Sequence, residues 1–99
     1  MKYLVEVNPD NRRANEIEEK NGFAPMVSYI NEHYKPECVY VNPTARQLFL
    51  IVDLANETDC CELSTWFARG TLSTPKLTPL AMPSIMTKAL DAVKRSPTI

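Results

Sequence analysis

His33 and Asp53 are the polar residues whose types and positions best suit acid–base chemistry. His33 is the only histidine, and an imidazole exchanges a proton near neutral pH and can also bind a metal. Asp53 ends a long apolar run, where a carboxylate can act as a general base. Each also has a purely structural explanation, because a cation suits the C-terminal end of a helix and an aspartate can mark the point where a strand meets water. Both are candidate pocket residues.

Two aromatic residues, Tyr29 and Trp66, complete the set of candidate pocket residues. Tyr29 lies one helical turn before His33, on the same predicted helix face. Trp66 lies beside the apolar stripe of its predicted helix. Because tryptophan is enriched at binding hot spots, Trp66 could line a pocket or an interface; the alternative is a partly buried residue at the rim of the core. No catalytic motif surrounds these residues, so catalytic residues stay unassigned.

The three cysteines, Cys38, Cys60 and Cys61, do not form a metal-binding pattern. Zinc sites usually separate paired cysteines by about two to four residues, whereas Cys60 and Cys61 are adjacent and would point roughly 100° apart on a helix. Acidic residues stand on both sides of this pair and disfavour the thiolate. An odd number of cysteines also argues against a disulfide framework. We therefore expect no metal and no cofactor.

Composition excludes several classes of partner. Eleven basic and twelve acidic residues leave a net charge of -1, which gives no general attraction for nucleic acid or anionic membranes. Only two glycines are present, so there is no glycine-rich phosphate loop. The apolar stretch at the N-terminus is too short for a signal-peptide core, and no segment approaches the ~20 apolar residues of a membrane span. A cytoplasmic protein is expected.

The first third of the chain predicts a strand and two helices. Residues 2–8 alternate as a strand does, and Pro9 ends them. Residues 12–20 are rich in helix formers, and Asn21-Gly22 resembles a C-terminal stop. A second helix, with Pro25 in its first turn, runs to Lys35-Pro36. One long helix broken near Gly22 is the alternative; two short helices are preferred.

The remainder predicts a hairpin, a helix, a strand and a final helix. Residues 38–41 and 47–54 read as strands joined by a short turn. A helix follows that begins at Asn56 or Thr58 and ends at Arg69-Gly70. A strand spans residues 76–82, a helix begins at Pro83, and residues 95–99 form a flexible tail. The order is β-α-β-β-α-β-α in one domain, residues 1–99, which predicts an α+β, ferredoxin-like, four-stranded antiparallel sheet with an added C-terminal helix.

The strand at residues 47–54 is apolar on both faces. Its apolar side chains divide into one face with Leu48, Leu50, Val52 and Leu54 and another with Phe49 and Ile51. Such a run indicates cover on both sides, and so short a chain has few residues left to supply it. A partner subunit is the expected cover for one face; a long loop of the same chain is the alternative, and such loops are uncommon. Phe49 and Ile51 are candidate dimer-interface residues.

Three segments between residues 35 and 80 resemble the dimeric α+β barrel superfamily, and most closely its small uncharacterised members. The segments are residues 35–41 (KPECVYV), 47–53 (QLFLIVD) and 76–80 (KLTPL). The resemblance implies a homodimer in which two ferredoxin-like subunits pack sheet against sheet, with pockets between the sheet and the helices of one subunit. Its members include cofactor-free monooxygenases, muconolactone-isomerase-like enzymes and haem-binding proteins. No catalytic residue carries over, since fold alone does not transfer function.

Two hypotheses about function follow. In the first, a homodimer binds or transforms a small organic molecule without a cofactor, in a pocket lined by Tyr29, His33, Asp53 and Trp66. In the second, the protein is a non-catalytic interaction or regulatory module whose dimer surface is the functional part. A closed cavity reached by His33, Asp53 or Trp66 favours the first, and a packed interior favours the second.

Overall fold

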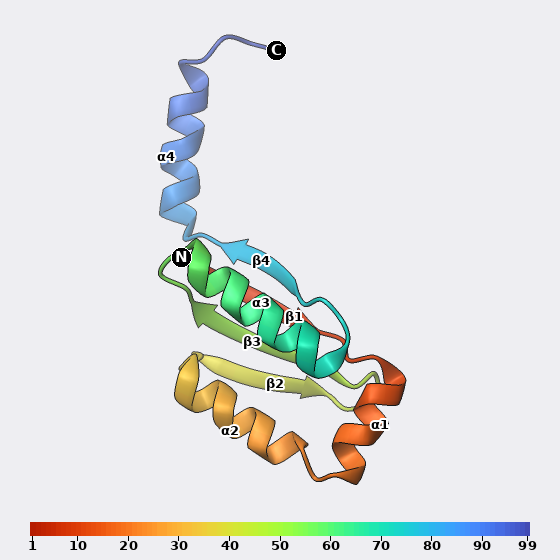
Figure 1. Ribbon diagram of the computed structural model, residues 1–99. Helices are drawn as coiled ribbons and strands as arrows, with labels where there is room; N and C mark the ends of the chain where they lie inside the picture. Colours follow the sequence, from red (N-terminus) through yellow and green to blue (C-terminus); the bar gives the residue numbers. More distant parts are fainter.

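The computed structural model describes residues 1–99 as an antiparallel sheet with two helices over one face, a short helix at one end and a last helix that leaves the body (Figure 1). The elements in chain order are β1 (Lys2–Val7), α1 (Asn11–Glu19), α2 (Phe23–His33), β2 (Cys38–Asn42), β3 (Gln47–Asp53), α3 (Glu57–Thr71), β4 (Lys76–Leu80) and α4 (Pro83–Lys94). Their order confirms the predicted α+β succession of strands and helices.

The sheet has the strand order β2-β3-β1-β4, and every neighbouring pair is antiparallel. The two inner strands are β1 and β3, and Val5 of β1 lies between Leu50 on one side and Leu77 on the other. The hairpin of β2 and β3 pairs Tyr40 with Phe49. This arrangement is the predicted ferredoxin-like sheet with an added C-terminal helix.

The break between α1 and α2 falls where the sequence predicts it. Asp10 caps α1, because its side chain accepts hydrogen bonds from the backbone N–H groups of Arg12 and Arg13. Asn21 then adopts a left-handed conformation with φ 52°, which asparagine tolerates better than most residues. The amide of the next residue, Gly22, bonds back to the Ile17 carbonyl. Two short helices, rather than one bent helix, are confirmed.

The C-terminal end of α3 differs from the prediction. The helix passes through Gly70, ends at Thr71, and is followed by the left-handed Leu72 with φ 56°. Neighbouring groups satisfy the last carbonyls without a glycine cap: the Asp10 amide donates to the Thr71 carbonyl, and Arg13 Nε donates to the Gly70 carbonyl. Contacts from α1 therefore set the end of α3, which a pattern read only within α3 cannot reveal.

The core lies between the helices and one face of the sheet. It consists of Val5, Val7, Leu48, Leu50, Val52 and Leu54 from the sheet side and Ile30, Leu63 and Phe67 from α2 and α3. Phe49 and Ile51 point to the opposite face and are only half-buried. The chain thus covers one face of β3 with its own helices. Cover of the other face stays a prediction.

Helix α4 stands apart from the rest of the molecule. Figure 1 shows it extending away from the end of β4, with the C-terminus beyond it, and none of its residues is buried. The radius of gyration is 16.8 Å, against about 13 Å for a compact chain of this length. None of the helices is both long enough and apolar enough to cross a membrane.

Candidate functional site

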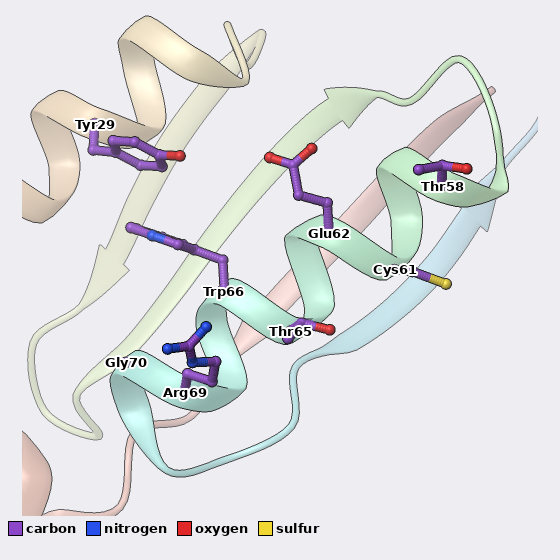
Figure 2. A pocket seen from close by; sticks show the side chains of 8 residues that line it. All are labelled: Tyr29, Thr58, Cys61, Glu62, Thr65, Trp66, Arg69 and Gly70. Carbon is purple, nitrogen blue, oxygen red and sulfur yellow. The ribbon is translucent and has the colours of Figure 1, made fainter.

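Three of the four predicted pocket residues form one aromatic stack between α2 and α3. The Tyr29 ring stacks on His33, with centroids 5.0 Å apart, and on Trp66, with centroids 4.7 Å apart. Figure 2 shows Tyr29 and Trp66 pointing toward each other from their two helices, with Arg69 beside Trp66 and Cys61 pointing away. One helical turn separates Tyr29 from His33, so both rings meet α3 on the same side.

Glu62 makes the polar contact of this stack, through His33, and the sequence did not predict it. Its Oε1 lies 2.6 Å from His33 Nε2, and the Tyr34 hydroxyl donates to the same oxygen at 3.4 Å. Burial, and then the negative charge of Glu62, raise the pKa of the Tyr34 phenol. A signal existed in the sequence, because Glu62 precedes Trp66 by one helical turn and therefore shares its face.

Asp53 lies near this stack but does not join it. Its side chain is 68% exposed, and its Oδ1 lies 2.9 Å from the amino group of Met1. A small surface hollow of about 250 Å³ places Asp53 near His33 and Glu62, but no hydrogen bond connects Asp53 to either. The structure therefore brings Tyr29, His33 and Trp66 together and leaves Asp53 at their edge.

These side chains line the surface rather than a closed cavity. The His33 side chain is 44% exposed and Tyr29 is 39% exposed. The broad hollow of about 800 Å³ beside Trp66 runs along the outer side of α3, between Thr58 and Gly70. Between the sheet and these helices, the core residues are at most 5% exposed. Every buried polar side-chain atom already has a hydrogen-bond partner.

A second hollow lies between the sheet and the helices at the other end of the molecule. It has a volume of about 350 Å³, and its apolar lining comes from α1, α2 and the hairpin, with Ile17, Phe23, Met26 and Leu48 among the lining residues. Arg46 stands at its side, held by Asn15 Oδ1 at 2.7 Å and Glu18 Oε2 at 3.2 Å. The sequence did not predict this hollow, because the hollow forms only through the packing of α1.

The face of the sheet opposite the helices is the third candidate surface. Register aligns Cys38, Ile51, Leu4 and Thr78 in one row across the four strands. The next row is Tyr40, Phe49, Glu6 and Lys76, in which Lys76 Nζ lies 3.8 Å from Glu6 Oε2. The middle of this face is therefore largely apolar, although no element of the chain lies over it (Figure 1). We call it the open sheet face.

The cysteines take separate environments. Cys60 packs against the core, Cys61 is exposed, and Cys38 is half-buried on the open sheet face. No three histidine, cysteine, aspartate or glutamate side chains form a group that could hold a metal ion. Cys60 therefore acts as a small, partly buried residue at the edge of the core.

Comparisons of the chain with protein-family models, with curated proteins and with solved structures found no match. The resemblance to the dimeric α+β barrels therefore rests on the order of the elements and on the three strand segments between residues 35 and 80. The architecture is compatible with a ferredoxin-like fold, and the function has to be argued from the surfaces.

Proposed function

We propose that this protein is a non-catalytic interaction module that works as a homodimer, in which the open sheet faces of two copies pack against each other. The observation that supports the proposal most strongly is the apolar middle of that face, where Leu4, Phe49 and Ile51 are half-buried and no helix or strand of the chain lies over them. An antiparallel sheet with one solvated face normally carries polar side chains there. Apolar side chains in their place favour a face that is removed from water.

The size of the core also supports a dimer. Only 12 of 99 residues are buried in the single chain, and small domains bury a low fraction of their surface. Each Å² of apolar surface removed from water contributes roughly 25 cal/mol. A second copy over the open sheet face would thus add stability that the single core does not supply.

The polar candidates favour interaction over catalysis. Glu62 binds both His33 and Tyr34 at the surface, where His33 and Glu62 are exposed, and the interior behind them is filled with apolar side chains. A catalytic pocket normally encloses most of its ligand in a concave site. The exposed stack instead provides an aromatic surface that another molecule can contact.

The test introduces a charge into the open sheet face and measures mass by sedimentation equilibrium. Ile51→Lys places an unpaired charge in the proposed interface, where burial is costly, so it should convert the dimer to a monomer. Tyr40→Lys is the second variant, because Tyr40 is 69% exposed in the single chain and its replacement leaves the monomer core intact. Thr65→Lys is the matched control, since Thr65 is exposed on α3, over the other face of the sheet.

The expected result is a monomer for Ile51→Lys and Tyr40→Lys, with a circular dichroism spectrum that retains the sheet, and a dimer for Thr65→Lys. If Tyr40→Lys stayed folded and dimeric at the same affinity as the native chain, the open sheet face would not be the interface.

The hollow beside Ile17 and Met26 supports a second candidate function, the binding of a small apolar molecule between the sheet and the helices. Its volume of about 350 Å³ falls at the lower end of ligand pockets. Native mass spectrometry of the purified protein should then show a small co-purifying adduct, which Met26→Trp removes by filling the space. An adduct-free native spectrum that matches the bare chain mass would remove this candidate.

A further inference from the structure

We propose that α4 is an arm that packs on the second copy of the chain, so that two copies clasp each other with their C-terminal helices. This inference rests on the proposed homodimer and extends it to a second contact. The arm, defined as residues 82–99, begins two residues after Leu80, the last residue of β4.

The arm carries an apolar stripe that has no cover in its own chain. Met82, Ile85, Met86, Leu90 and Val93 are 49–70% exposed, and their spacing places them on one side of the helix. A free helix shorter than about 12–15 residues is marginal in water, and α4 has 12 residues. A surface against which the stripe packs would therefore stabilise the helix.

The link to β4 directs the arm away from its own body. Only residues 81 and 82 separate β4 from α4, and Met82 is extended, with φ -70° and ψ 148°. Pro83 fixes its own φ and restricts the residue before it. A short, stiff link of this kind holds α4 in the projecting position that Figure 1 shows.

Two observations favour a second copy over an unrelated partner. First, Leu80 at the end of β4 pairs with Lys2 of β1 and so belongs to the open sheet face. Leu80, Met82 and Ile85 are all exposed apolar residues, so exposed apolar side chains follow one another from the edge of that face into the arm. A copy that covers the sheet therefore lies next to the arm.

The second observation is charge. The arm has three basic residues, Lys88, Lys94 and Arg95, and one acidic residue, Asp91, which gives it a charge of +2. Since the whole chain carries -1, residues 1–81 carry -3. A basic arm is attracted to the acidic body of another copy.

The test combines a crosslink with a substitution in the full chain. Val93 is replaced by the photoreactive residue p-benzoylphenylalanine, and isotope-labelled and unlabelled chains are mixed before illumination. We expect crosslinked peptides that join a labelled chain to an unlabelled one. Crosslinks confined to single chains would show that α4 folds back on its own body. The absence of any crosslink would show that α4 packs on no other surface. Either result would contradict the proposal that α4 packs on the second copy.

Leu90→Glu supplies the affinity measurement. Because a buried leucine contributes strongly to association, we expect it to raise the dimer dissociation constant about tenfold or more. Ser84→Glu adds the same charge to the opposite side of α4 and should leave the constant unchanged. If Leu90→Glu leaves the dissociation constant unchanged while Tyr40→Lys gives a monomer, α4 does not pack on the second copy, and the open sheet face is the dimer interface. If Leu90→Glu gives a monomer while Tyr40→Lys leaves the dissociation constant unchanged, α4 packs on the second copy, and the open sheet face is not the dimer interface.

Discussion

At the scale of single residues, the α2–α3 surface is held together by side chains that satisfy one another. Glu62 accepts from Tyr34 and contacts His33, and Tyr29 stacks between His33 and Trp66. Exposed ion pairs contribute little to stability on their own. The stacked rings, which also cover the edge of the core, contribute more to this surface than the charges do.

Tyr34 gives this surface a pH-dependent property. Burial and the Glu62 carboxylate raise its pKa above the ordinary tyrosine value, because both disfavour the phenolate. The folded chain therefore holds the proton more tightly than the unfolded chain does. The stability that this provides is fully present below about pH 10, and it falls as the pH rises above that value.

Ultraviolet titration of the four tyrosines tests this property. Tyr34→Phe should remove the last phenol to ionise, and Glu62→Gln should move that last step to lower pH without abolishing it, since burial remains. If the final step of the titration were identical in Tyr34→Phe and the native chain, the pKa assignment would be wrong.

Contacts between residues could be predicted from the sequence when both residues lie on the same helix or strand. Tyr29 and His33 share a helix face, so their proximity follows from their spacing. Trp66 stacks on Tyr29 and Glu62 contacts His33 only because α2 and α3 pack side by side, and the spacing of residues within one helix cannot reveal that packing. Asp53 was predicted for the same pocket but lies at the edge, because its strand ends in solvent.

At the scale of elements, the ends of α3 follow two different rules. Asn56 caps its start within the local sequence, by accepting from the Asp59 amide. Its end depends on donors from α1, which is why the predicted stop at Gly70 was two residues too early relative to the left-handed Leu72. Capping by neighbouring residues could be predicted from the sequence, and capping across the fold could not.

The structure consequently does not require a glycine at position 70. It lies within α3, and a Cβ there would meet no atom within 4 Å. Gly70→Ala should raise the free energy of unfolding by about 0.5–1 kcal/mol, because glycine in a helix costs conformational entropy. Urea denaturation at one fixed protein concentration measures the change.

Gly22→Ala is the matched control for this prediction. A Cβ at Gly22 would lie 3.3 Å from the Ile17 carbonyl oxygen. Gly22→Ala should therefore raise the free energy of unfolding by less than Gly70→Ala does, or lower it. Equal gains for both substitutions would contradict the explanation given for Gly70.

At the scale of the whole molecule, the fold could be predicted largely because each strand and helix carries its own local pattern. The alternation in β3 correctly separated Leu48, Leu50 and Val52 from Phe49 and Ile51. It could not indicate which set meets the helices, since both sets are apolar. The packing of α2 and α3 decides that question in favour of the first set.

The two surfaces that the chain leaves without cover are the open sheet face and the stripe of α4. Both are properties of the assembled chain, and both would be removed from water by the same event, the docking of a second copy. The elongated form of the single chain, 57 × 28 × 24 Å, is explained if the chain is half of a compact dimer.

The most direct measurement is the mass of the native chain in sedimentation equilibrium at micromolar concentration. We expect twice the chain mass of 11.2 kDa. In that dimer, thiol reagents should reach Cys61 readily and Cys38 slowly, because Cys38 lies on the open sheet face. A species of 11.2 kDa across that concentration range would contradict the proposed homodimer.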